Sequence, residues 1–174
     1  MRRPTMVAIG IFFVAAAAFT APSLQAQTPA KPAAKMKAGA FRVDMTESSE
    51  IKLPAEFQVS LYEDLIKQLQ KKGGFKVYRE GDKNADNAGD LVILKTSVLG
   101  FKEGSERLRQ VTTVAGATSI KVHCTFSDKD GKTLLENDIQ GNVRFFGGNL
   151  RATYDFAKKT AQVARDNFSP AGGK

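Results

Sequence analysis

The adjacent pair His123 and Cys124 is the place in this sequence where a nucleophile stands beside a possible base. A cysteine nucleophile needs its base within hydrogen-bond reach. Apolar and polar residues alternate from Ile120 to Phe126, which predicts a strand. Neighbours on a strand point to opposite faces, so these two side chains cannot meet. We therefore expect an inert, buried Cys124 and a surface His123.

Other catalytic and metal-binding chemistries lack the residues that they need. A Ser–His–Asp triad would have to use His123, and the sequence has no Gly-x-Ser-x-Gly elbow. One Cys and one His cannot build a zinc cage, and a single Cys cannot form an internal disulfide. The paired acids Glu63–Asp64 and Asp128/Asp130 are expected on a helix face and in a turn. We predict no catalytic residues, no metal and no cofactor, with a hydrolase that uses His123 as an alternative.

The glycine pair before the last predicted helix is the best candidate for a ligand site. Gly147 and Gly148 precede Asn149 at a strand-to-helix junction, where exposed N–H groups can hold an anion. Arg144 and Arg151 flank this junction, and arginine planes match carboxylate and phosphate oxygens. The alternative is a tight turn into a helix that Asn149 caps.

A second group of basic residues lies beside the turn at Gly104. Arg107 and Arg109 follow this turn and could extend an anion-binding surface. Such residues also occur as solvated charges that discourage association between sheet edges. Both interpretations stay open from the sequence.

The first 26 residues follow the three-part pattern of a secretory signal. Arg2 and Arg3 precede the thirteen-residue apolar run VAIGIFFVAAAAF, and small residues follow it up to Ala26. A membrane span needs roughly 18 apolar residues or more, and this run is shorter. We predict cleavage after Ala26 and a periplasmic or secreted protein without a transmembrane anchor after cleavage. A signal that is retained as an anchor is the alternative.

The charge of the chain is unevenly distributed. The 174 residues include 26 basic and 18 acidic ones, a formal net charge of +8. Residues 27–39, QTPAKPAAKMKAG, predict a flexible linker, followed by one domain over 40–170 and a tail over 171–174. Without two signal arginines, three linker lysines and Lys174, the 26 basic residues fall to 20 against 18 acidic ones, or +2. This nearly neutral domain argues against a general basic surface, and nucleic acid is not an expected partner.

The first elements that must position these residues form a crossover. Residues 41–45 and 75–79 alternate as short strands. Between them Phe57, Leu61 and Leu65 recur every four residues, which predicts a helix that begins at Pro54. Strand, helix and strand predict a right-handed parallel crossover.

The rest of the domain is expected to extend this sheet. We predict strands over 91–101, 120–126 and 133–145, with a hairpin turn at 128–131. Residues 108–114 are a candidate for a further strand beyond this set. A last helix over 150–167 carries the stripe Leu150, Tyr154, Ala157, Ala161, Ala164 and Phe168. The order β-α-β-β-β-β-α predicts an α+β two-layer sandwich with a mixed, mostly antiparallel sheet of about five strands and two helices on one face.

Several pieces of the chain match a gapped family pattern. They are GDLVILKTSVLGFKEGSERLRQ, VAGATSIKVHCTFSDKDGKTLLENDIQG and FFGGN, between Gly89 and Gly148. On these turn and packing signatures the chain resembles the bacterial domain-of-unknown-function family 4410. The resemblance implies an exported or envelope-located bacterial protein. It brings no activity, ligand or catalytic residue with it.

The export signal, the linker and the missing catalytic set predict a non-catalytic binding or assembly module of the bacterial envelope. Its partner would be an envelope protein or an anionic envelope component. The alternative is a small-anion or ligand-binding protein that uses Gly147, Gly148 and the nearby arginines.

Overall fold

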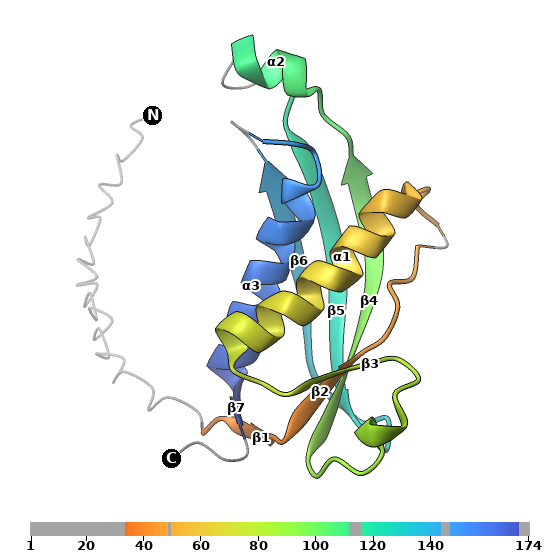
Figure 1. Ribbon diagram of the computed structural model, residues 1–174, viewed down its shortest axis with the longest axis vertical. Coiled ribbons are helices and arrows are strands. Elements are labelled where there is room, and N and C mark those ends of the chain that lie inside the picture. The colour runs from red at the N-terminus through yellow and green to blue at the C-terminus, as the bar shows by residue number, and fades with distance from the viewer. Residues whose placement is uncertain (1–33, 49, 112–115, 144–146, 171–174) are drawn as a thin grey trace, which may run out of the picture. The chain divides into compact units, whose positions relative to one another are not determined.

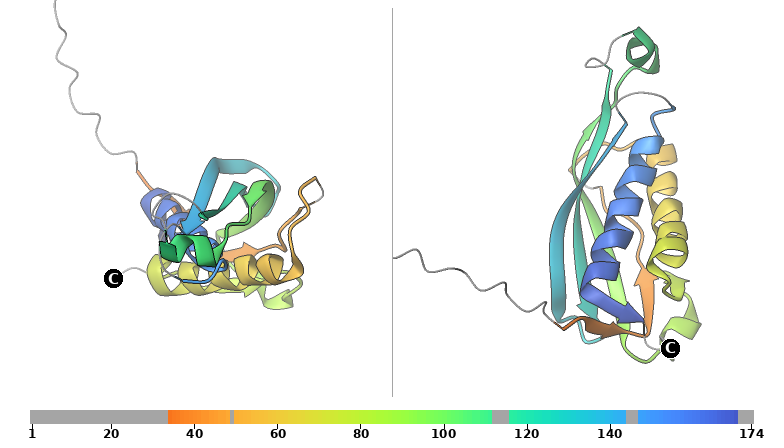
Figure 2. Two further views of the ribbon diagram at one scale, coloured as in Figure 1. Left: turned by 90° about the horizontal axis from the view of Figure 1, so that it is seen from above. Right: turned by 90° about the vertical axis from the view of Figure 1, so that its left-hand side faces the viewer.

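The main sheet of this computed structural model has five strands, and two long helices cover one of its faces (Figures 1 and 2). The structure describes residues 34–48, 50–111, 116–143 and 147–170. The expected signal, residues 27–33 of the expected linker and the tail lie outside these ranges. The sheet order is β3-β2-β4-β5-β6. The strands of this sheet are β2 (Ala40–Val43), β3 (Val77–Arg79), β4 (Leu91–Lys102), β5 (Thr118–Asp128) and β6 (Thr133–Val143).

The two halves of this sheet differ in direction. β2 pairs in parallel with both β3 and β4, and α1 (Ala55–Gln68) connects β2 to β3. The parallel crossover is thus confirmed. β4, β5 and β6 follow as an antiparallel meander. The described chain is therefore the α+β two-layer sandwich that the sequence predicts, with two parallel and two antiparallel pairings in its main sheet.

Local sequence signals explain the turns between these elements. α1 passes into a π-helical turn (Leu69–Gly73), and Gly74 ends it with a φ of +72°. The β5–β6 hairpin turns at Gly131, which has a φ of +83°. The Asp128 carboxylate accepts the backbone N–H groups of Asp130 and Lys132 at 3.0 and 2.9 Å. The Asp-Gly signal therefore predicts this hairpin correctly.

The core lies between the sheet and the pair α1 and α3 (Arg151–Asn167). The α1 residues Phe57, Leu61 and Leu65 are buried, as the periodicity predicts. The face of α3 was predicted less well. Ala157, Ala161 and Ala164 are buried, but the side chains of Leu150 and Tyr154 are 39% and 44% exposed. Ala152, Thr153 and Phe156 occupy the inner face of the first turns instead.

The strand predicted over 108–114 is wrong where the structure describes it. Glu106–Val111 form a short helix, α2, beyond the ends of β4 and β5 in the sheet (Figure 1). The Ser105 hydroxyl accepts the N–H of Leu108 at 3.4 Å, as a helix-capping serine does. The sequence Ser105–Glu106 is therefore a helix start rather than part of a turn.

A small second sheet joins the two ends of the described chain. β1 (Met36–Ala38) pairs in parallel with β7 (Phe168–Pro170). β1 falls within the range expected to be linker. Ala38 is fully buried, and the Lys35 ammonium donates to the Arg165 carbonyl at 2.8 Å. Ordered structure therefore begins before residue 40.

Candidate functional site

The start of α3 brings the predicted glycine pair and Arg151 together. Gly147 has a φ of +107°, a left-handed conformation that favours glycine. The Arg151 side chain lies so close to Gly147 that a Cβ at this position would collide with its Cδ atom. The glycine therefore leaves the space that the arginine side chain occupies. Arg144 lies outside the described residues.

The first amides of α3 already have partners. The N–H groups of Arg151, Ala152 and Thr153 donate to the carbonyls of Gly148, Asn149 and Leu150, each at 3.1 Å. An anion at this helix start would compete with these bonds. The small-anion site stays a prediction.

Asn149 connects α3 to the loop before α2, and its predicted role as the helix cap is wrong. The residue before the helix is Leu150, and no side chain caps it. The Asn149 Oδ1 accepts the Thr118 hydroxyl at 2.8 Å. Its Nδ2 donates to the Gly104 carbonyl at 3.2 Å and to the Glu103 carboxylate at 3.1 Å. The side chain thus holds the α3 start beside residues 103–104.

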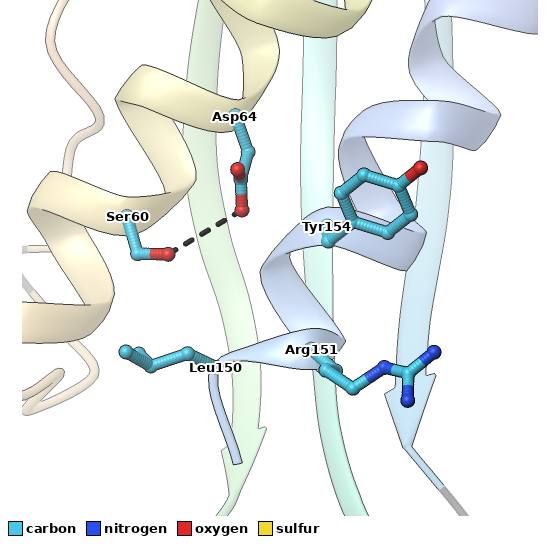
Figure 3. A pocket seen from close by; sticks show the side chains of 5 residues that line it. All are labelled: Ser60, Asp64, Leu150, Arg151 and Tyr154. Carbon is cyan, nitrogen blue, oxygen red and sulfur yellow. Dashed lines mark hydrogen bonds between the residues drawn. The ribbon is translucent and has the colours of Figure 1, made fainter. Parts of the chain in front are cut away.

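A hollow of about 440 Å³ lies between α1 and the first turns of α3. We call it the helix pocket (Figure 3). The buried Thr153 hydroxyl lies within hydrogen-bond distance of the Asp64 Oδ2 at 2.8 Å, the Leu150 carbonyl at 2.6 Å and the Ser60 hydroxyl at 2.8 Å. The Arg151 guanidinium points away from the Asp64 carboxylate (Figure 3). The helix pocket is lined by Ser60, Asp64, Leu150, Arg151 and Tyr154.

Of the predicted site residues, Arg151 is the one that lines this pocket. Gly147, Gly148 and Asn149 lie in the turn before it, and Arg107 is exposed on α2. The side chain of Arg109 is not described. Sequence reasoning missed the Ser60–Asp64 pair. Its spacing of four residues on a predicted helix places both side chains on one face, which was a usable signal.

The His123–Cys124 pair is arranged as its strand pattern predicts. Cys124 is fully buried, and burial raises the pKa of its thiol to about 12. His123 lies on the opposite, open face of the sheet. Its Nδ1 is 2.7 Å from the Asp138 Oδ1, and its Nε2 is 4.0 Å from the Glu136 Oε1.

The open face beside His123 does not form a catalytic triad. Ser97 is the cross-strand neighbour of His123, and both line a hollow of about 180 Å³. Within the described residues, no hydrogen bond joins Ser97 to the imidazole. The hydrogen bond from His123, and next that from Lys121, lower the pKa of the Asp138 carboxyl. These groups therefore form an exposed polar cluster around the ion pair between Lys121 and Asp138.

Two features, metal-binding clusters and membrane-spanning helices, are absent from the described ranges. Those residues contain no group of three His, Cys, Asp or Glu side chains that could hold a metal ion. None of the helices in that part of the chain is long and apolar enough to cross a bilayer.

Comparisons with known proteins give a family and a fold. The family described as "Domain of unknown function (DUF4410)" matches residues 14–145. No curated protein matches the chain. A PelC variant from Paraburkholderia phytofirmans, described as a dodecamer, has a TM-score of 0.55 and 13% identity over 80% of this chain and 96% of that chain.

Two further structures extend this comparison. Another crystal form of the PelC dodecamer has a TM-score of 0.55 and 13% identity, over 77% of this chain and 91% of that chain. A Xanthomonas campestris protein of the DUF330 family has a TM-score of 0.44 and 13% identity, over 78% and 85%. At these identities the PelC likeness shows the fold alone.

Proposed function

Since this chain belongs to the DUF4410 family, whose description assigns no activity, we propose that it is an exported, non-catalytic assembly module of the bacterial envelope. Its binding partner in this proposal is a further copy of the same chain. The observation that carries the proposal is the exposed apolar face of α2.

The exposed face of α2 has no cover among the residues that the structure describes. The side chains of Leu108 and Val111 are 50% and 80% exposed. Neither of the two buried clusters among the described residues includes a residue of α2. A helix of six residues is marginal in water without packing. Contact with another molecule would remove this apolar surface from water and stabilise the helix.

The fold likeness adds support for self-association. PelC, which has a similar fold, is described as a dodecamer. The same two-layer sandwich is therefore compatible with an assembly of many copies.

The long edge of the sheet is a less favourable contact than α2. The Asp155 carboxylate accepts the N–H of Asn142 at 3.0 Å, and the Lys159 ammonium donates to the Gln140 carbonyl at 2.8 Å. These two side chains also form an ion pair with each other at 2.7 Å. Part of the backbone of β6 is therefore already covered, which disfavours sheet extension there.

The proposed export is supported by the signal pattern before residue 27. Fractionation of cells that express the full-length chain should place it in the periplasm or the medium. Sequencing of the purified protein should begin at Gln27. A cytoplasmic protein that retains Met1 would contradict the proposed export.

The proposed assembly is tested by light scattering on the purified protein over a range of concentrations. We expect a mass that rises with concentration to a defined multiple of one chain. A single-chain mass at every concentration would contradict self-association. Recovery of a specific envelope protein with that monomer would instead favour a heteromeric module.

A further inference from the structure

We propose that α2 of one copy docks into the helix pocket of the next copy. The docking face of α2 consists of Arg107, Leu108 and Val111, and we call it the tip face. This inference rests on the self-assembly proposed above, and it specifies the two surfaces that meet.

The tip face combines one charge with two apolar side chains. Leu108 and Val111 are three residues apart, and Arg107 and Val111 are four apart. Both spacings place side chains next to each other on a helix. All three residues are exposed. The tip face can therefore present a guanidinium beside two apolar side chains.

The helix pocket offers the complementary groups. Leu150 and Tyr154 are half-exposed apolar and aromatic side chains on its α3 side. On its α1 side, the Ser60 and Thr153 hydroxyls both approach the Asp64 Oδ2, at 3.4 and 2.8 Å. The Asp64 Oδ1 takes no hydrogen bond from the described residues. The pocket therefore pairs an apolar wall with a carboxylate oxygen that can still accept.

These two surfaces match in chemical type. Leu108 and Val111 can bury apolar area against Leu150 and Tyr154. The Arg107 guanidinium can donate to the Asp64 carboxylate, and such charge-assisted bonds are among the stronger hydrogen bonds in proteins. Opposite charges at the contact also fix its register.

The positions of the two surfaces favour a ring. Asn149 binds the Gly104 carbonyl, so the start of α3 lies beside the loop that leads to α2. The tip face and the helix pocket therefore lie at the same end of the sheet. When α2 of one copy docks into the pocket of the next, the second copy is therefore shifted only slightly along the strand direction relative to the first. A head-to-tail contact with little displacement closes into a ring, whereas a large displacement gives a filament.

The first test uses a tip variant, Leu108→Glu with Val111→Glu, and a pocket variant, Leu150→Glu with Tyr154→Glu. All four side chains are exposed, so both variants should fold, which circular dichroism checks. Each variant alone should associate at least tenfold more weakly than the wild type. An equimolar mixture should form a dimer, because one intact tip face and one intact pocket remain. The matched control is Leu99→Glu, at a strand position that is 47% exposed.

The outcomes separate this docking from the proposed function. Normal assembly of both variants would overturn the docking and leave self-assembly standing. If each variant fails to assemble and the equimolar mixture forms no dimer, the docking is overturned in favour of a symmetric contact. A wild type that is monomeric at every concentration would overturn both. The wild type and the pocket variant could bind phosphatidylglycerol vesicles while the tip variant does not. If all three proteins assemble equally, that result would assign α2 to a lipid surface instead.

The charge pair has its own test. Arg107→Asp and Asp64→Lys should each weaken association, and the two changes in one chain should restore it. Lys158→Asp on the exposed side of α3 serves as the control for a surface charge reversal. If the double variant associates no better than the single ones, Arg107 and Asp64 do not meet.

Discussion

At the scale of single residues, burial decides which reactive groups remain available. The sequence separates His123 from Cys124 by strand alternation alone, and the structure confirms the separation. It could not show that Ser60 and Asp64 meet Thr153, because these residues lie on two helices and are 93 and 89 positions apart in the chain. The side-chain directions within one strand are therefore predictable here, and the side-chain contacts between the two helices are not.

Cys124 should be unreactive in the folded protein. Burial raises the pKa of the thiol to about 12, so at pH 8 the reactive thiolate is scarce as well as covered. Treatment with a maleimide at pH 8 should leave the native protein unlabelled by mass spectrometry. The same treatment in guanidinium chloride should add one label. Rapid labelling of the native protein would show that β5 opens readily.

Gly141 should resist substitution by alanine. A Cβ at this position would collide with the Ala152 carbonyl and lie 2.6 Å from the Phe156 Cβ. Gly141→Ala must therefore push α3 away from β6, and we expect a loss of about 1–3 kcal/mol of stability. Gly100→Ala is the matched strand control, because its nearest atom would be 3.9 Å away. Equal urea midpoints for the two variants would refute the close packing.

At the scale of elements, the sequence predicts those whose signals are local and repeated. The four-residue apolar period of α1 and the Asp-Gly turn of the β5–β6 hairpin are confirmed. Two predictions failed because the local sequence pattern was compatible with two different structures. Leu108 and Val111 suited a strand or a helix, and Ser105 supplied the helix start. In α3, alanines on several faces left the inner face ambiguous, and Phe156 settled it by packing against the core.

The partly covered edge of β6 gives a prediction at this scale. Asp155→Ala removes the acceptor of the Asn142 N–H, so this amide should exchange with deuterium about tenfold faster. Nuclear magnetic resonance can follow this single amide. Asp166→Ala, at an exposed position farther along α3, should leave its exchange unchanged. An unchanged rate in Asp155→Ala would mean that this carboxylate does not protect the edge.

At the scale of the whole molecule, the small sheet of β1 and β7 extends the folded part of the chain. A chain that starts at Gly39 lacks β1 and the buried Ala38, whereas a chain that starts at Ala34 keeps both. We expect the shorter chain to lose about 1 kcal/mol or more, which is roughly 2–8 °C in melting temperature. Differential scanning calorimetry measures this difference. Identical melting temperatures would show that residues 34–38 add no stability to the fold.

The parallel pairing of β1 with β7 also sets how the molecule carries load. Met36 lies opposite Phe168, and Ala38 lies opposite Pro170, so the chain enters at one end of this ladder and leaves at the other. If the N-terminal segment tethers the protein while its C-terminal end is pulled, the force slides the two strands past each other. The ladder bonds then break together rather than one by one. The two ends of the fold are thus joined by a strand pair that is loaded in shear, the direction in which its hydrogen bonds resist force together.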